Sequence, residues 1–201
     1  MNRTIKLLML SDIFMLTGFG LIQPILAIFI KENLPEGTIF AAGLASTIFI
    51  ITKSVVQLPF SKYVDDHDNK VKWLIIGSSI ICIAPFIYIF STHIYYIYLA
   101  QFLFGIGSGL AYPTWLGLWS INLDKHHESF EWSLYSTLTG LGTAVTAGVG
   151  AAVAQYIGFQ LTFILTGIMS VISCCVLFFL EQKREKTAKI RDLHYYMHEK
   201  V

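Results

Sequence analysis

Charged residues are scarce in this sequence. Only 13% of the 201 residues are Asp, Glu, Lys or Arg, whereas 55% are hydrophobic, and the mean hydropathy is +0.62. Because soluble domains carry about 25% charged residues, a soluble domain and a nucleic-acid partner are both excluded. The composition predicts an integral membrane protein that is embedded in a lipid bilayer.

Cysteines and catalytic motifs are also scarce. Cys82, Cys174 and Cys175 all fall inside apolar runs, which predicts reduced packing residues and no disulfide framework. The adjacent histidines of residues 126–128 point apart on a loop, so no metal site is expected there. Since no nucleophile elbow, phosphate loop or zinc-protease helix is found, we expect neither an enzyme nor a cofactor.

The sequence is rich in long apolar runs. They are continuous and do not alternate with polar residues, which favours transmembrane helices over barrel strands. A helix needs roughly 20 apolar residues to cross the bilayer. The runs predict six spans: residues 7–30, 39–61, 72–91, 94–122, 132–157 and 159–180. They form one domain, residues 1–182, and a basic tail follows at 183–201.

The positive charges predict how these spans are oriented. If the N-terminus lies inside the cell, twelve of the fourteen Lys and Arg residues lie in internal segments, including the tail. Lys31 alone is outside, and Lys53 lies within the second span. Positive residues are concentrated on the cytoplasmic side of membrane proteins. We therefore expect a multi-pass protein of the cell membrane with both termini in the cytoplasm.

Two charges are predicted to lie within the membrane. Asp12 in the first span and Lys53 in the second lie at similar depths, and Gln57 follows Lys53 by one turn on the same helix face. Charges at bilayer depth are costly and are usually paired, close to an interface, or functional. Two interpretations stay open: an interhelical ion pair with Lys53 reaching toward the inner surface, or a site for a coupling ion or a charged substrate.

Uncharged polar residues mark a candidate substrate cavity. Gln23 and Pro24 in the first span and Gln101 in the fourth lie in the outer half of the membrane. Polar groups at that depth are expected to face the bundle interior or a cavity. Tyr112 and Trp115 are candidates for its lower part, although aromatic residues close to a helix end also serve as interface anchors.

Glycine is concentrated in the fourth and fifth spans. Small residues let helix backbones approach closely in lipid, and Gly105 and Gly109 have the GxxxG spacing. The residues expected to pack helices together are Gly105, Gly107, Gly109, Gly142, Gly148 and Gly150.

The loop after the second span resembles the signature of the major facilitator superfamily. Ser61 stands for its first glycine, Asp65 for its aspartate and Lys70 for one of its basic residues. The run from Gln101 to Gly107 is similar to a glycine element of the family's fourth helix, with Gln101 in place of an arginine. That replacement puts proton-coupling roles of the arginine in doubt.

The resemblance implies one six-helix half of a twelve-helix transporter fold. Such folds enclose the substrate between two halves, so a second half is needed. The chain reads as complete, which favours a half-size transporter of a small molecule working by alternating access as a homodimer. Two alternatives stay open: a non-transporting scaffold or accessory subunit, and one half of a split transporter with a partner half. The substrate, the direction of transport and the coupling ion are not predicted.

Overall fold

A computed structural model describes residues 2–67 and 69–198, with side chains as far as Leu180. All the regular elements in these residues are helices. They are α1 (Arg3–Gly20), α2 (Leu26–Asn33), α3 (Ile39–Asp66), α4 (Lys70–Ile89), α5 (Ile94–Asn122), α6 (Glu128–Tyr156) and α7 (Phe159–His198).

Five described helices are long and apolar enough to cross a membrane. They are α3, α4, α5, α6 and residues 159–180 of α7, close to five of the six predicted spans. The predicted first span, 7–30, is instead divided into α1 and α2. Between them the amides of Leu21 and Ile22 bond back only three residues, at 3.1 and 3.0 Å, and Pro24 has no amide to donate. The chain bends there because the regular helical ladder is interrupted.

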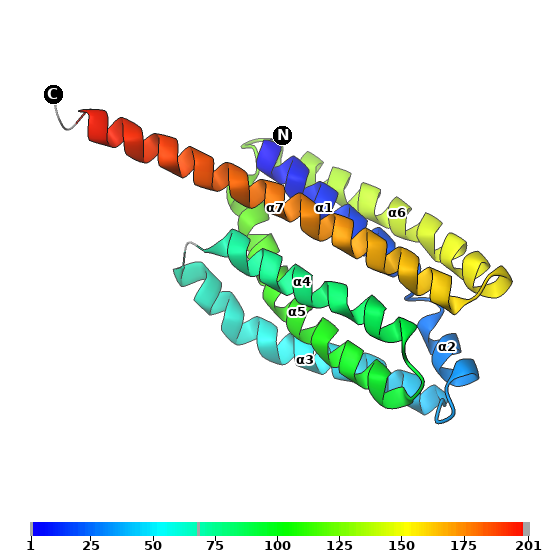
Figure 1. The fold of residues 1–201 in the computed structure, drawn as a ribbon. Coiled ribbons are helices and arrows are strands. Elements are labelled where there is room, and N and C mark those ends of the chain that lie inside the picture. Colours follow the sequence, from blue (N-terminus) through cyan, green and yellow to red (C-terminus); the bar gives the residue numbers. More distant parts are fainter. Residues whose placement is uncertain (1, 68, 199–201) are drawn as a thin grey trace.

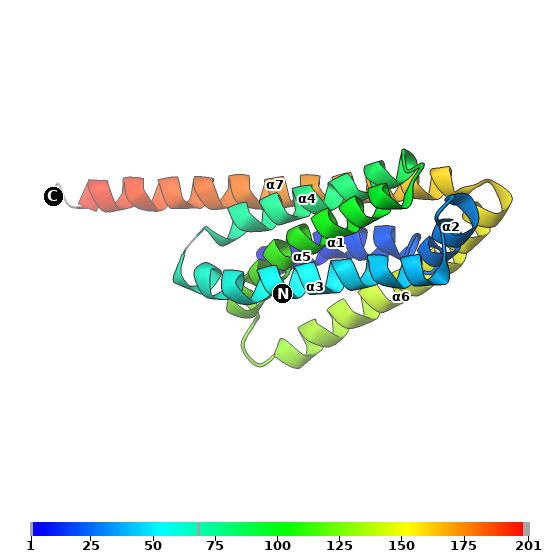
Figure 2. The ribbon, with the colours of Figure 1, turned by 90° about the horizontal axis from the view of Figure 1, so that it is seen from below.

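The helices form two groups of three. In Figure 1, α1, α6 and α7 lie together, as do α3, α4 and α5, while α2 bridges the groups at one end. Figure 2 shows α4 and α7 along one face of the bundle and α3 and α6 along the opposite face, with α1 and α5 between them. The N-terminus and the connections after α3 and α5 lie at the same end of the bundle.

Helix α5 packs closely against two neighbours through its glycines. A Cβ atom at Gly105 would lie 2.7 Å from Thr52 Cβ, and one at Gly109 would lie 2.8 Å from Val56 Cβ, both on α3. Gly107 faces α4, where a Cβ atom would lie 2.7 Å from the Gly77 carbonyl oxygen. These backbones can approach one another only because the side chains are missing.

The glycines of α6 differ from one another. Gly142 lies against Thr17 and Gly150 against the Leu21 backbone, so both are in close contact with the segment that begins with α1. By contrast, a Cβ atom at Gly148 would meet nothing within 4 Å. Among the described residues the expected close packing at Gly148 is therefore not made, because that glycine lies on an exposed helix face.

Hydroxyl groups join α1 to α7. The Ser173 hydroxyl donates to the Ser11 carbonyl at 2.7 Å, and the two hydroxyls lie 3.0 Å apart. Two turns away, the Thr166 hydroxyl donates to the Gly18 carbonyl at 2.9 Å. All three side chains are buried, so these bonds satisfy hydroxyl groups inside the bundle.

Two features define the ends of α7. Gly158 has a φ of +125° in the short turn between α6 and α7, a conformation that favours glycine. At the other end α7 continues to His198, so the backbone of the predicted tail extends the last membrane helix. The side chains of that tail, and residues 199–201, lie outside the described part of the structure.

Candidate functional site

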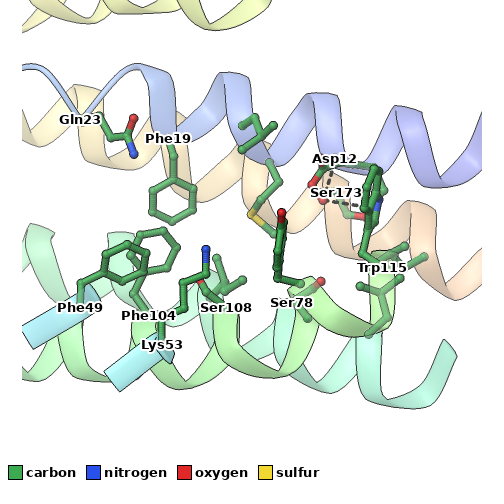
Figure 3. Close-up of a pocket in the computed structure, with 18 of the residues that line it drawn as sticks. Asp12, Phe19, Gln23, Phe49, Lys53, Ser78, Phe104, Ser108, Trp115 and Ser173 are labelled. Atoms are coloured by element: carbon green, nitrogen blue, oxygen red, sulfur yellow. Dashed lines mark hydrogen bonds between the residues drawn. The ribbon is translucent and has the colours of Figure 1, made fainter. Parts of the chain in front are cut away.

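A cavity of about 370 Å³ lies within the bundle. Its walls come from every helix except α2, together with Gln23 in the turn that follows α1. The lining residues are Ser11, Asp12, Met15, Leu16, Phe19, Gln23, Phe49, Lys53, Leu74, Ser78, Ile81, Phe104, Ser108, Ala111, Tyr112, Trp115, Tyr135, Ser173 and Leu177. Figure 3 shows Asp12 and Trp115 toward one end and the rings of Phe19, Phe49 and Phe104 toward the other.

Asp12 is held at its end of the cavity by an aromatic hydroxyl. Tyr135 of α6 donates its phenolic hydroxyl to Asp12 Oδ2. Ser11, the residue before Asp12, is fixed to Ser173 by the α1–α7 hydroxyl contact. The carboxylate is therefore oriented by two neighbouring helices, as a binding group in a cavity must be.

Lys53 lines the same cavity from α3. Its ammonium nitrogen lies 4.6 Å from the centre of the Tyr112 ring, which is the geometry of a cation–π contact. Within the described residues no ion pair joins Lys53 to Asp12. The two charges thus share a cavity without pairing. Asp12 is bonded to Tyr135, and Lys53 lies over the ring of Tyr112. Gln57, the predicted third member, is not among the residues that line the cavity.

Trp115 belongs to an aromatic cluster that includes Tyr135, the hydrogen-bond partner of Asp12. Its ring stacks on Trp119 with centroids 4.9 Å apart, and Trp132 and Tyr135 of α6 pack against both rings. Trp115 is buried, lines the cavity, and its indole N–H has no hydrogen-bond partner within the described residues. The nitrogen itself is buried, so the part of Trp115 that lines the cavity is its ring. Tyr112, also predicted, lines the cavity beside Lys53.

Gln23 and Gln101 both line a second, smaller cavity of about 140 Å³. Gln23 lines both cavities, whereas Gln101 lines only the smaller one. Gln101 is buried, and its amide donates to the Tyr88 hydroxyl at 3.1 Å. Pro24 lines neither cavity; it is exposed at the bend between α1 and α2.

The loop signature lies apart from both cavities, at the end of α3. Ser61 and Asp65 line a shallow surface groove there. The ammonium group of Lys70 donates to the carbonyl oxygens of Val64 and His67, the latter at 3.5 Å. Lys70 therefore satisfies carbonyl groups that the helix end leaves without amide partners.

The two adjacent histidines lie in the loop before α6. His127 is the N-cap of that helix, and His126 has a φ of 71°.

Several cavity residues could not be singled out from the sequence. Tyr135, Phe49 and Phe104 occur in ordinary apolar or mixed runs, and their importance comes from partners on other helices. Ser11 and Ser173 carried a weak signal, because a hydroxyl within an apolar span is expected to bond to a neighbouring helix. Nothing in the sequence showed which helices those neighbours are.

Comparison with known proteins identifies the family. Residues 8–193 match the sequence profile of the Major Facilitator Superfamily. The chain belongs to this superfamily. It is 20% identical over 173 residues to quinolone resistance protein NorA of Staphylococcus aureus, which covers 86% of this chain and 44% of NorA. The superfamily assignment agrees with the resemblance seen in the loop and in α5.

Solved transporters of the superfamily share the fold. The POT family transporter PepTSo superposes with a TM-score of 0.79 at 17% identity, covering 90% of this chain and 38% of that one. An autoinhibited POT family peptide transporter gives 0.77 at 18% identity, covering 91% and 38%. The chain thus spans less than half the length of these relatives. It is a multi-pass membrane protein whose fold matches part of a superfamily transporter.

Proposed function

We propose that this chain is one half of a secondary transporter that moves a small molecule across the cell membrane by alternating access. The observation that carries the proposal is the central cavity, in which an aspartate and a lysine that do not pair with each other line mostly apolar walls. Buried charges are costly in a membrane and are retained where a substrate or coupling ion uses them. Membership of the superfamily supports the same conclusion.

The second half is best supplied by another copy of the chain. In their most apolar stretches α3 and α6 are each only 11% buried, against 50% in α4 and α5. Both lie on the same face of the bundle, and α1 and α5, which line the cavity, lie behind them (Figure 2). A second bundle against this face would cover both helices and close the cavity.

A two-fold axis along the membrane normal fixes which helices would meet. Helices α3 and α6 stand at opposite edges of their common face (Figure 1). A half-turn about an axis between them exchanges the two edges, so α3 of one copy packs against α6 of the partner. The cavities of the two copies then face one another across the axis.

The cavity walls favour an amphipathic substrate. Six of the lining residues carry aromatic rings: Phe19, Phe49, Phe104, Tyr112, Trp115 and Tyr135. Rings of this kind bind flat apolar surfaces, while Asp12 and Lys53 provide groups for a polar substituent. NorA carries quinolone resistance in its name, so a quinolone is a reasonable first compound to test.

We infer the orientation from the positive charges. The N-terminus and the connections after α3 and α5 lie at one end of the bundle, and most Lys and Arg residues belong to that end. The positive-inside rule then supports cytoplasmic N- and C-termini.

Transport is tested with purified protein in liposomes that contain a fluorescent quinolone. We expect flux driven by an ion gradient, and a loss of about tenfold or more in Asp12→Asn and Lys53→Gln, because each variant removes a charge from the cavity. Glu32→Gln and Lys31→Gln make the same chemical changes at exposed positions of α2 and are expected to keep full flux.

Two results would contradict the proposal. Equal flux in the cavity variants and in their controls would show that the cavity is not the pathway. If no compound of varied charge and aromatic content is moved, and the chain co-purifies with a different membrane protein, it would instead be an accessory subunit or one half of a split transporter.

A further inference from the structure

The two cavities are neighbours within the bundle and share part of their walls. Phe19, Gln23, Phe49 and Phe104 line both. Asp12 and Lys53 line only the larger cavity, and the residues that line only the smaller one are uncharged. Its hydrogen-bonding side chains are Ser46, Tyr88, Gln101 and the shared Gln23. The shared residues therefore lie between a cavity that has charged residues in its wall and a cavity that has none.

Three of the shared residues form a continuous stack of rings. Phe104 lies between the other two: its ring centre is 4.4 Å from that of Phe19 and 4.6 Å from that of Phe49. The planes differ by only 5° and 17°. Rings at these separations are in van der Waals contact, so no water molecule fits between them.

The three rings come from three different helices: Phe19 from α1, Phe49 from α3 and Phe104 from α5. Next to Phe104, Gly105 brings α5 so close to α3 that a Cβ atom there would lie 2.9 Å from the Phe49 carbonyl oxygen. Phe49 and Phe104 are therefore held together by closely packed backbones, and their contact is the fixed part of the stack.

Phe19 is attached differently. It is the next-to-last residue of α1, directly before the bend at residues 21–25. Its carbonyl accepts from both Ile22 and Gln23, at 3.0 Å each, where the hydrogen-bond ladder changes register. A change in this bend would move the Phe19 ring relative to the other two, because helix bends at such interruptions act as hinges.

We propose that the Phe19–Phe104–Phe49 stack is the barrier between the two cavities, and that Phe19 is the ring that moves when they join. This inference rests on the proposed transport function, since it names the step a substrate must pass. A tight apolar constriction stops ions and water. An aromatic substrate can replace ring–ring contacts with its own, so the stack would pass amphipathic molecules and hold back small ions.

The barrier is tested by chemical access, which does not require transport. Cys82, Cys174 and Cys175 are replaced by serine, and single cysteines are then placed at Ser108, which lines only the larger cavity, or at Ala42, which lines only the smaller one. A charged methanethiosulfonate reagent that does not cross membranes is added to one face of vesicles at a time. The face that labels Ser108→Cys is the face to which the larger cavity opens, and that face is used throughout.

With the stack intact, we expect Ala42→Cys to react at least about tenfold more slowly than Ser108→Cys from that face. Phe104→Ala should raise the Ala42→Cys rate by roughly tenfold or more, because it removes the central ring. Phe102→Ala is the matched control: Phe102 lies on the same helix, is exposed and lines neither cavity, so its loss should leave the rate unchanged.

Phe19→Ala and Phe104→Leu keep the test valid if Phe104→Ala does not fold. Phe19→Ala should open the barrier to a similar extent, whereas Phe104→Leu, which keeps most of the volume, should open it less. Equal labelling of Ala42→Cys and Ser108→Cys with all three rings present, or no change in any folded stack variant, would overturn the barrier. If the labelling pattern is as expected but the protein moves no quinolone, the result would count against the transport function and not against the barrier.

Discussion

Helices α5 and α6 have the same length, 29 residues, and both are rich in glycine, yet they pack in opposite ways. In α5, Gly105 and Gly109 are pressed against α3, and Gly107 against α4. In α6, Gly142 and Gly150 contact the α1 segment, but a Cβ atom at Gly140 or Gly148 would meet nothing within 4 Å. The most apolar stretch of α5 is 50% buried, and that of α6 only 11%.

This difference distinguishes packing that holds one bundle together from a surface left for another. The glycines of α5 are packed against two helices of the same chain, so α5 holds this bundle together. The outer face of α6, like that of α3, has no neighbour in the part of the chain that the structure describes. We therefore interpret the open glycines of α6, together with the exposed side chains of α3, as the surface that the second half covers.

The largest expected effect is at Gly107. In Gly107→Val the new side chain would collide with the backbone of α4 at Gly77 and Ile81, which cannot move without separating two helices. We expect destabilisation by about 3 kcal/mol, the upper end of the range for overpacking, and a large loss of folded protein. Thermal unfolding followed by size-exclusion chromatography measures both. A variant as stable as the parent chain would show that α5 is not tightly packed.

The same substitution in α6 should act on assembly instead. A Cβ atom at Gly148 would meet nothing within 4 Å in the described structure, so the Gly148→Val monomer should fold with an unchanged melting temperature. If Gly148 lies in the proposed contact, the valine weakens dimerisation by roughly tenfold, in the range of overpacking costs. Dilution of labelled protein in liposomes, followed by energy transfer, gives the dissociation constant. Destabilisation of the monomer itself would break the comparison with Gly107.

A smaller effect is expected where hydroxyls join the helices. Ser173→Ala removes the bond to the Ser11 carbonyl while leaving the packing almost unchanged. Interhelical hydrogen bonds in membranes contribute about 0.6 kcal/mol on average and at most about 1.7. We expect a loss of stability in that range in denaturant titrations. Ser133→Ala, on the exposed side of α6, is the control. An effect as large as that of Gly107→Val would show that hydroxyls outweigh backbone contact.

The smallest effect is expected outside the membrane helices. His93 Nδ1 lies 3.2 Å from Glu36 Oε1, and this hydrogen bond holds the pKa of Glu36 below its ordinary value. Its contribution is present above the ordinary carboxylate pKa and is lost as the pH falls through the lowered pKa. Because both side chains are exposed, Glu36→Gln should change the melting temperature at pH 7 by less than about 1 °C. A larger change would mean that the contact between His93 and Glu36 contributes substantially to stability.

The sequence predicted the helical membrane fold and most of its segments, because apolar run length reports directly on membrane helices. Asp12 and Lys53 stood out for the same reason, as charges within apolar runs. Pro24 lies at the bend between α1 and α2, but the sequence predicted one span over residues 7–30. The reason is that hydropathy does not show where the pattern of backbone hydrogen bonds in a helix is interrupted.

What the sequence could not supply is which residues meet. Tyr135 is far from Asp12 along the chain, and its hydroxyl finds the carboxylate only because α6 packs beside α1. Likewise Phe49 and Phe104 are ordinary apolar residues until three helices bring the rings together. Glycine spacing predicted close approach in both α5 and α6. Gly107 and Gly148 look alike in sequence, yet among the described residues only Gly107 has a close neighbour.

The central claim, that α3 and α6 carry the contact with a second copy, is tested most directly by cysteine cross-linking in native membranes. Two differently tagged copies without native cysteines carry Val55→Cys on α3 and Leu141→Cys on α6, both exposed at similar depths. Ile83→Cys with Ile172→Cys, on α4 and α7 of the opposite face, is the control pair. We predict cross-links between copies for the first pair and not for the second. Cross-links for the control pair alone, or for neither, would contradict the account.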